Sequence, residues 1–484
     1  MQMQPDRTAR RLLASIVPPL LGACAMILGA TAPALAAGAG PALDGARLGL
    51  VWAIPFAAML LSIAILPLAA PAFWHAQYGK VSAACALGFL VPAAMNHGLD
   101  TAAYELVHTL LLEYVPFIVL LLALYVVAGG IRLTGTLVGT PEVNTAILAF
   151  GTLIASWTGT TGACVLLIQP LIRANAWRTR RTHVFVFFIF LVGNVGGGLT
   201  PLGDPPLFIG FLEGVDFFWT LRAMALPTLA MAVPLLAAFF VIDRHLHRRE
   251  PAPAPAGSHE PFGIDGKRNL VLLVAVIGVV LASGAWRSGI SFTIHHTVVT
   301  LESAARTVAL LAIVAASLLL TRRETRTLND FDWHPIVEVA KLFIGIFVTI
   351  VPVLAIVRAG AEGAAAGLVD VLAADGRPHD PMYFWITGIL SAFLDNAPTY
   401  LLFFNFAGGD AQVLMGPRAS TLLAISAGAV FFGAVSYIGN APNFMVKAIC
   451  ERRGIAMPSF FGYLAWSTVF LLPLFVVVNR MFFA

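Results

Sequence analysis

Two aspartates lie in stretches of sequence that are otherwise apolar, and each is close to a proline. Asp204 directly precedes Pro205, and Asp395 lies three residues before Pro398. An ionised carboxylate at the centre of a bilayer costs roughly 2.5–3.5 kcal/mol on insertion scales, so such residues usually mark ion or proton pathways. A carboxylate that holds either a proton or Na⁺ couples the two by competition. The alternative is structural, because each aspartate can also cap a helix that begins beside it.

Short polar side chains accompany both aspartates. Their hydroxyl, amide and carboxylate oxygens suit a hard cation such as Na⁺, which we expect at Asp204, Asp395 and Asn396. Glycines beside them would let the backbone approach an ion closely. The predicted ion- or substrate-binding residues are Thr158, Thr160, Thr161, Asn194, Thr200, Asp204, Asp395, Asn396, Thr399, Ser436, Asn440 and Asn443. The predicted positions of close backbone approach are Gly196, Gly197, Gly198, Gly203 and Gly439.

These residues fall in four interrupted apolar stretches. Residues 143–171 and 381–407 carry Gly, Pro, Thr or Asn at their centres, and residues 183–212 and 419–449 are too long for one straight helix. Irregular backbone at membrane depth is tolerated only where it is buried in protein or lines a cavity. At such a break, helix N-termini offer N–H donors to anions and helix C-termini offer carbonyls to cations. The pattern predicts two re-entrant hairpins and two broken helices.

The sequence also matches itself. The segment from Gly197 to Phe208 aligns with the segment from Gly433 to Phe444, which pairs Asp204 with Asn440. The same offset places 159–163 opposite 395–399, the centres of the two proposed hairpins. Each half then has an odd number of spanning segments, so the second copy is inverted. The alternative is a chance similarity between two Gly- and Pro-rich segments, which a shared offset disfavours.

Composition places the chain in a membrane. Of its 484 residues, 59% are hydrophobic and only 11% are charged, whereas about a quarter of a soluble domain is charged. The basic residues lie between apolar spans and form no patch with interleaved aromatics, so we expect no nucleic-acid partner. The four cysteines are far apart, without metal-ligand or disulfide spacing. We therefore predict an all-α polytopic membrane protein with no cofactor, in contact with the lipid bilayer.

Basic residues also set the predicted orientation and the domain boundaries. If both hairpins enter and leave on one side, the strongly basic loops all fall on the cytoplasmic side of a bacterial inner membrane. Residues 1–36 read as a signal sequence or a first transmembrane helix. The first repeat is predicted at 48–242, a Pro- and Ala-rich cytoplasmic connector at 243–267, and the second, inverted repeat at 268–484.

The segments Gly193–Asp204 and Phe393–Thr399 resemble signature motifs of the ion-transporter superfamily. This group includes sodium/proton antiporters of the NhaD type, arsenite permeases and citrate or dicarboxylate transporters. The resemblance implies re-entrant hairpins, unwound helices and a homodimer. The Gly-Asp and Asp-Asn-x-Pro pieces are similar to those of the antiporters. The hairpins lack the Ser-Asn-Thr triplet of the carboxylate importers, although chains with Asp-Asn-Ala-Pro-Thr are also similar to citrate transporters.

These residues are compatible with three functions. The first is alternating-access exchange of Na⁺ or Li⁺ for H⁺ through Asp204 and Asp395. The second is transport of citrate or another small carboxylate coupled to Na⁺ or H⁺, for which Arg358 is a candidate anchor. A remote third is an intramembrane aspartyl protease, since two aspartates can share a proton. Such proteases have a Gly-x-Gly-Asp pattern, and Pro201 replaces its first glycine. We therefore expect a transporter and not an enzyme.

Overall fold

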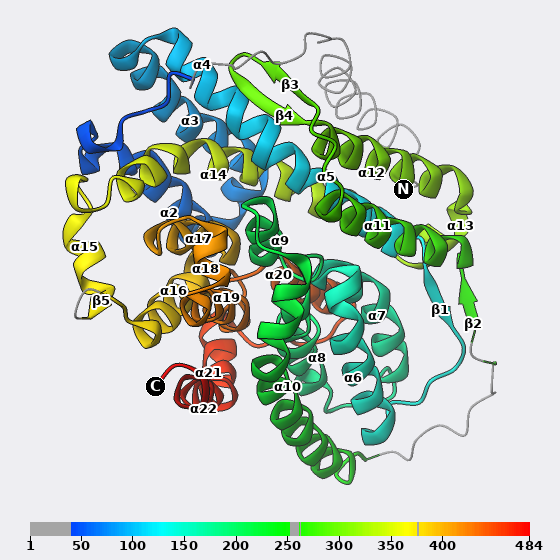
Figure 1. Cartoon of the computed structure of the whole chain (residues 1–484). Coiled ribbons are helices and arrows are strands. Elements are labelled where there is room, and N and C mark those ends of the chain that lie inside the picture. The colour runs from blue at the N-terminus through cyan, green and yellow to red at the C-terminus, as the bar shows by residue number, and fades with distance from the viewer. Residues whose placement is uncertain (1–39, 252–260, 262, 375–376) are drawn as a thin grey trace.

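The computed structural model describes residues 40–251, 261, 263–374 and 377–484. Over this part the chain is built almost entirely from helices (Figure 1). The N-terminal half contains η1 (Gly45–Arg47), η2 (Leu50–Ala53), α2 (Ile54–Ala69), α3 (Pro71–His97), α4 (Leu99–His108), the π-helix η3 (Thr109–Tyr114), α5 (Val115–Ala128), α6 (Pro141–Thr158), α7 (Thr160–Ala174), α8 (Thr182–Leu191), η4 (Val195–Leu199), α9 (Pro205–Leu212) and α10 (Phe217–His247). The C-terminal half contains α11 (Lys267–Ala285), α12 (Leu301–Leu320), α13 (Arg323–Leu328), α14 (His334–Arg358), η5 (Gly360–Glu362), α15 (Ala366–Val371), α16 (Asp380–Leu394), α17 (Asn396–Phe406), α18 (Ala411–Met415), α19 (Ala419–Phe432), α20 (Ala441–Arg452), α21 (Phe460–Phe470) and α22 (Leu472–Phe482).

The strands are short and form antiparallel pairs outside the long helices. β1 (Arg132–Thr134) pairs with β2 (Gly263–Asp265), which joins the end of the α5 region to the start of α11. β3 (Ser291–Ile294) and β4 (Thr297–Thr300) form a hairpin between α11 and α12. β5 (Ala373–Ala374) pairs with β6 (Arg377–Pro378) before α16. None of these pairs is long enough to form a core of its own.

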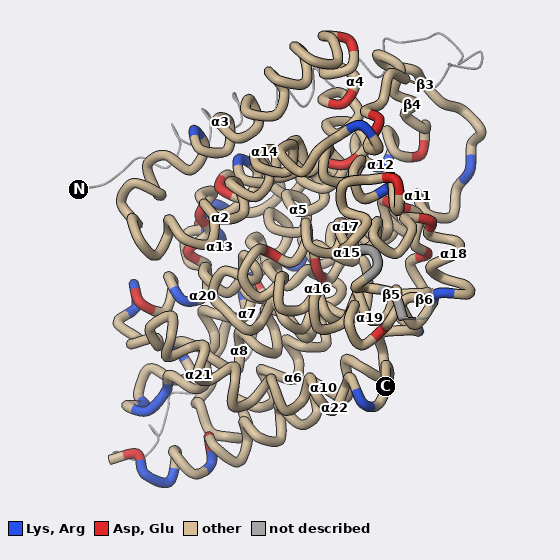
Figure 2. Tube along the Cα trace, turned by 90° about the vertical axis from the view of Figure 1, so that its left-hand side faces the viewer, with Lys and Arg blue, Asp and Glu red and all other residues tan. Residues whose placement is uncertain are grey.

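The long helices form an outer and an inner layer. In the described residues, eight helices are long and apolar enough to cross a membrane, or up to nine if the bent pair α21–α22 is one span. Only 22% of the most apolar window of α3 and of α11 is buried in protein, against 89% for Thr182–Leu199. Charged residues lie mainly at helix ends and in loops (Figure 2). The chain is therefore an all-α polytopic membrane protein, as predicted, and the span that contains α8 is the most buried of these candidate spans.

Both predicted hairpins are present. Asn144, near the start of α6, and Asn175, just after α7, exchange side-chain hydrogen bonds of 2.8 and 2.9 Å, so the two helices lie antiparallel. In the second hairpin the rings of Tyr383 in α16 and Phe403 in α17 are 6.3 Å apart. The hairpins lie on opposite sides of α9 in Figure 1. The tip of the first hairpin contacts the first broken helix, where the Thr160 N–H donates to the Gly203 carbonyl at 2.8 Å.

The two halves share their local geometry at the offset seen in the sequence. Asp204 and Asn440, 236 residues apart, are the extended N-cap residues of α9 and α20. At the hairpin tips, Gly159 has φ 75° and ψ 148°, and Asp395 has φ 78° and ψ 140°. Such φ values favour glycine, so Asp395 adopts a backbone conformation that is costly for a residue with a Cβ. The repeat predicted from the sequence is thus visible in equivalent turns; its inverted orientation in the membrane stays a prediction.

The connector is shorter than predicted. Helix α10 continues to His247, and β2 already begins at Gly263, so the range 243–267 includes helix and strand. The helix continues because Asp243 is fully buried and hydrogen-bonded rather than solvated. The predicted signal segment 1–36 and connector residues 252–260 lie outside the described residues.

A close backbone contact at the first break gives a prediction. A Cβ on Gly203 would lie 2.2 Å from the carbonyl oxygen of Gly197. We expect Gly203→Ala to destabilise the purified protein by about 1–3 kcal/mol, as overpacking does, and to lower its thermal unfolding midpoint. Gly278→Ala is the matched control, since nothing lies within 4 Å of a Cβ there. Equal midpoints for the two variants would contradict the tight contact.

Candidate functional site

Asp204 lies where the first broken helix resumes. Its backbone is the N-cap of α9, but its side chain makes no cap hydrogen bond, so the capping alternative does not hold for this residue. Oδ1 accepts hydrogen bonds from the Thr160 hydroxyl at 3.1 Å and from the Asn440 amide at 2.8 Å. Oδ2 accepts one from the Asn396 amide at 2.6 Å. One carboxylate thus joins the tips of both hairpins and the second broken helix.

The partners of Asp204 are all neutral. The side chain is only 2% exposed, and no ion pair is formed by Asp204 among the described residues. Burying a carboxylate without a compensating charge is costly, even where hydrogen bonds satisfy its oxygens. The group is therefore suited to bind a proton or a metal cation.

Asp395 has a different role at the second hairpin tip. Its side chain accepts a hydrogen bond from the Ala397 N–H at 3.1 Å, so it caps α17, as the structural alternative proposed. Its neighbour Asn396 is fully buried and donates to Asp204. The Asn396 carbonyl oxygen Oδ1 is buried and has no hydrogen-bond partner among the described residues. An unpaired acceptor thus lies on the residue that contacts the central carboxylate.

A chain of buried amides extends from Asp204 between the two halves. Asn440 also donates to the Asn194 side chain at 3.2 Å, and Asn194 donates to Asn443 at 2.7 Å. Asn443 in turn donates to the carbonyls of Gly433 and Ser436. Within the described part of the chain no hydrogen bond joins Asn194 or Asn443 to the carboxylate, so we expect these two residues to position Asn440.

The predicted hydroxyl residues fall into two groups. Thr160 contacts Asp204, and Thr161 lines the cavity described below. The others donate to backbone carbonyls: Thr158 to Ile154, Thr399 to Asp395, Thr200 to Ser156 and Ser436 to Ala392. The last two bonds are equivalent, each joining residues 44 apart, and each ties a broken helix to the hairpin of its own half. Thr200 and Ser436 therefore hold the unwound backbone in place, whereas Thr158 and Thr399 bond within their own hairpins.

The predicted glycines lie where backbones or side chains approach closely. A Cβ on Gly196, Gly198 or Gly439 would lie within 3 Å of Thr152, Thr228 or Gly433 respectively. A Cβ on Gly197 would lie 2.6 Å from the Thr160 methyl group and 3.1 Å from the Asp204 Cβ. Gly197 therefore provides space for the central carboxylate and its hydroxyl donor.

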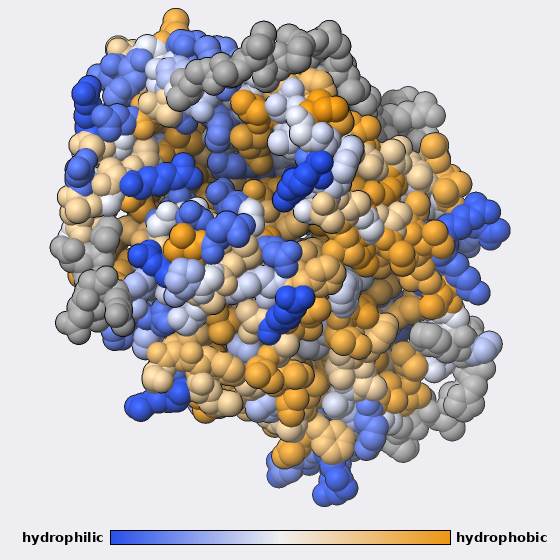
Figure 3. All heavy atoms as spheres, viewed as in Figure 1, coloured by the Kyte–Doolittle hydropathy of each residue, from blue (hydrophilic) through white to orange (hydrophobic). Residues whose placement is uncertain are grey.

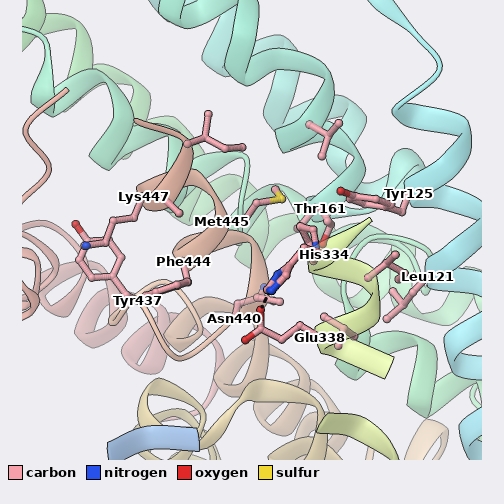
Figure 4. Close-up of a pocket in the computed structure, with 18 of the residues that line it drawn as sticks. Leu121, Tyr125, Thr161, His334, Glu338, Tyr437, Asn440, Phe444, Met445 and Lys447 are labelled. Atoms are coloured by element: carbon pink, nitrogen blue, oxygen red, sulfur yellow. Dashed lines mark ion pairs between the residues drawn. The ribbon is translucent and has the colours of Figure 1, made fainter. Parts of the chain in front are cut away.

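A cavity of about 860 Å³ leads to these tips. At its inner end it is lined by Gly159, Thr160, Asp204, Asp395 and Asn440. Figure 4 shows side chains from several elements around it, including Tyr125 of α5, His334 and Glu338 of α14, and Lys447 of α20. The side chain of His334 is 52% exposed, so the cavity reaches the surface at that end.

Sequence reasoning did not assign the residues at the outer end of this cavity. His334 Nδ1 lies 3.6 Å from Glu338 Oε2, and Lys447 pairs with Glu451 at 2.8 Å. The lining carboxylates are Asp204, Asp330, Asp332, Glu338, Asp395 and Glu451, against the cationic side chains of Lys447 and Arg452. Arg358 is not part of the lining and instead donates to Asn405 at 2.7 Å. Carboxylates therefore outnumber cationic side chains in the lining, with Asp330 paired to Arg453 just outside it.

Ser156 is a further site residue that the sequence analysis missed. Its hydroxyl donates to the Gly196 carbonyl and accepts from the Leu199 N–H, and its own carbonyl accepts from Thr200. The sequence could have indicated this role, because a serine in an apolar helix one turn before a glycine break must find backbone hydrogen-bond partners. The offset of 236 pairs Ser156 with Ala392, and the neighbouring Ser391 donates to the Ala429 carbonyl.

The arrangement does not resemble an aspartic-protease dyad. No hydrogen bond joins the Asp204 and Asp395 side chains in the described structure, because their oxygens bind Thr160, Asn396, Asn440 and the Ala397 N–H. Among the described residues, no group of three or more His, Cys, Asp or Glu is arranged to hold a metal ion. Any Na⁺ here would use amide, hydroxyl and backbone oxygens beside one or two carboxylates.

Comparison with known proteins agrees with this geometry. Residues 45–483 match the family described as "Putative citrate transport". No curated protein matches the chain. The family match covers both hairpins, both broken helices and the cavity. The chain therefore belongs to this citrate-transport family and is a multi-pass membrane protein, a secondary transporter of the ion-transporter kind.

Proposed function

We propose that the protein exchanges Na⁺ or Li⁺ for H⁺ by alternating access, with Asp204 as the group that holds either ion. The observation that carries the proposal is the neutral surroundings of Asp204. Thr160, Asn396 and Asn440 donate to it, and none of them supplies a positive charge. A buried carboxylate in such a place is stable when it is protonated or when a cation neutralises it. The carboxylate cannot hold a proton and a Na⁺ or Li⁺ ion at once, so binding of one ion releases the other and their movements are coupled.

Oxygen atoms that could bind the cation lie on residues beside Asp204. The unpaired Asn396 Oδ1 and the Thr160 hydroxyl lie on residues that touch Asp204. The carbonyl oxygen of Gly203 accepts a hydrogen bond from the Thr160 N–H at 2.8 Å, so backbone oxygens also lie at the tip. Hard cations prefer oxygen ligands of this kind. Asp395, which lines the same cavity, would add a second negative charge.

The cavity provides the route on one side. It runs from the tips to His334 and Lys447, and α20 ends nearby at the basic pair Arg452 and Arg453. Basic loops favour the cytoplasmic side, so we assign this as the inward-facing state. Movement of the hairpins and broken helices against the outer helices would then open the site to the other side. The bacterial inner membrane and a homodimer are the expected setting.

Citrate transport is the second candidate, and the family match favours it. A citrate anion would meet Lys447 and Arg452 in the outer part of the cavity. Lys447 already pairs with Glu451, and carboxylates outnumber cationic side chains in the lining. The charge of the cavity therefore supports a cation as the transported species more than a free carboxylate.

The two candidates can be separated in inverted membrane vesicles from a host without its own antiporters. A pH gradient is imposed, Na⁺ or Li⁺ is added, and dequenching of a pH-sensitive dye is followed. We expect dequenching with either cation and no dependence on citrate. A response that requires citrate, together with uptake of labelled citrate, would favour the second candidate and reject cation exchange as the main activity.

A further inference from the structure

A second cavity lies far from the hairpin tips, at one end of the outer helices. It has a volume of about 510 Å³ and lies between the β1–β2 pair, the start of α11 and the region where α12 gives way to α13. Its basic lining residues are Arg132, Lys267, Arg268 and Arg322, and its acidic ones are Asp265 and Glu324. None of these residues belongs to the transport site described above.

The positive charge of this cavity is largely uncompensated. Arg132 pairs with Asp265 at 3.3 Å, which accounts for one base and one acid. Lys267, Arg268 and Arg322 have no ion pair or side-chain hydrogen bond within the described part of the chain, and Glu324 is the remaining acid of the lining. The buried Nε of Arg132 also has no partner there. The cavity is therefore suited to an anion with several acceptor oxygens, such as a phosphate ester.

Apolar surface continues directly from the cavity along the helices. On α11, Val271 is 70% and Val274 is 67% exposed, and on α12, Leu319 is 85% exposed. In Figure 3 this outer face is largely apolar, and hydrophilic side chains gather at its right-hand edge, where α13 and the start of α11 lie in Figure 1. Both helices are long and apolar enough to cross a membrane. Acyl chains can therefore pack below an anionic group held in the cavity.

We infer that this cavity binds the headgroup of an anionic phospholipid. Basic pockets between membrane helices bind such headgroups, since the phosphate pairs with Lys and Arg while the chains stay in the bilayer. The strand pair explains why a pocket exists here and not merely a basic loop. Pairing of Arg132, Leu133 and Thr134 with β2 brings Arg132 beside the start of α11, which is distant in sequence. The inference is independent of which ion or substrate the protein transports.

Lipid binding by the purified full chain tests this inference. Native mass spectrometry would be used to titrate phosphatidylglycerol, phosphatidylcholine and inorganic phosphate. We expect a preference for phosphatidylglycerol that Arg268→Gln/Arg322→Gln weakens about tenfold or more, because each basic residue near an anionic surface contributes roughly fivefold. The matched control is Arg248→Gln/Arg249→Gln, two exposed basic residues at the end of α10 outside the cavity.

The outcomes are distinct. The site is supported if the control and Arg268→Lys/Arg322→Lys keep the preference for phosphatidylglycerol and Arg268→Gln/Arg322→Gln loses it. Equal weakening in the Gln double variant and the control would show general charge attraction and overturn it. Competition by inorganic phosphate as strong as that by the lipid would assign the cavity to free phosphate and overturn the lipid headgroup. Thermal midpoints of all variants are measured alongside, and the single variants Arg268→Gln and Arg322→Gln replace a double variant that does not fold.

Discussion

Asp204→Asn reduces cation-driven proton movement to the background of vesicles without the protein. Asparagine keeps the size of the side chain but can neither release a proton nor carry a negative charge. Its amide would also face the donors Thr160, Asn396 and Asn440, which now bind the carboxylate oxygens. The measurement is dye dequenching after addition of Na⁺ or Li⁺, at equal amounts of protein in the membrane and over a range of pH values.

The control for this result is Asp216→Asn. Asp216 is an exposed aspartate that caps α10 through the N–H groups of Phe218 and Trp219, and it does not line the cavity. We expect this variant to retain exchange. Full exchange by well-expressed Asp204→Asn would contradict the role of Asp204. Loss in both variants would point instead to damage of the membrane fold.

Asp243→Asn destabilises the protein by about 3–5 kcal/mol, the usual cost of removing one partner of a buried ion pair. Asp243 accepts from Arg178 at 2.5 Å and lies 2.8 Å from His183 Nε2, and both charged side chains of the ion pair are fully buried. Without this carboxylate, the acid that still pairs with Arg178 among the described residues is Glu250, at 3.6 Å. The variant should show a lower thermal midpoint in detergent and less folded protein in the membrane.

Glu250 cannot replace Asp243. Burial opposes its ionisation, but N–H groups of Thr179 and Arg180 and the Arg178 guanidinium outweigh this effect and lower the pKa of Glu250. Glu250 is thus already charged at neutral pH, and its negative charge already offsets part of the charge of Arg178 in the wild type.

In Arg178→Met/Asp243→Leu, apolar groups replace both charges, so we expect part of the stability to return. An exposed control, Arg47→Gln, removes a surface pair with Asp44 and should cost less than about 1 kcal/mol. A midpoint for Asp243→Asn equal to that of this control would contradict the prediction.

Much of the architecture was predictable because the breaks have local causes. Gly159 and Asp395 end helices where apolar sequence continues on both sides, and the structure places hairpin tips at both. The self-match also predicted that Asp204 and Asn440 occupy equivalent positions. Both start a helix before Pro205 or Pro442 by the same preference of proline for the first turn.

The contacts between the halves were not predictable from the same pattern. A repeat aligns Asp204 with Asn440, but it does not indicate that the two side chains meet at 2.8 Å. That contact depends on how the halves dock, which involves side chains more than 200 residues apart. The sequence also could not decide whether Asp204 and Asp395 bind an ion or cap a helix, since both roles use a carboxylate at the start of a helix. The structure separates them: Asp395 caps its helix and Asp204 does not.

The cluster around Asp243 shows a second limit. The sequence analysis placed this residue at the start of a solvated connector, which was predicted from a Pro- and Ala-rich run flanked by basic residues. The residue is nevertheless buried, since it faces Asn144 of the first hairpin and His183 at the start of α8. Hydropathy averages over a window and does not register one inward-facing acid on the basic end of a helix. A buried partner such as Arg178 becomes visible only in three dimensions.

Proton release on cation binding tests the central role of Asp204 most directly. Purified protein in a weakly buffered detergent solution is titrated with NaCl, and the pH is recorded against a choline chloride control of equal ionic strength. If Asp204 holds either a proton or Na⁺, Na⁺ acidifies the solution by up to one proton per chain, and Asp204→Asn releases none. An equal release from wild type and Asp204→Asn, or no release from folded wild type at any pH, would contradict competition at this carboxylate.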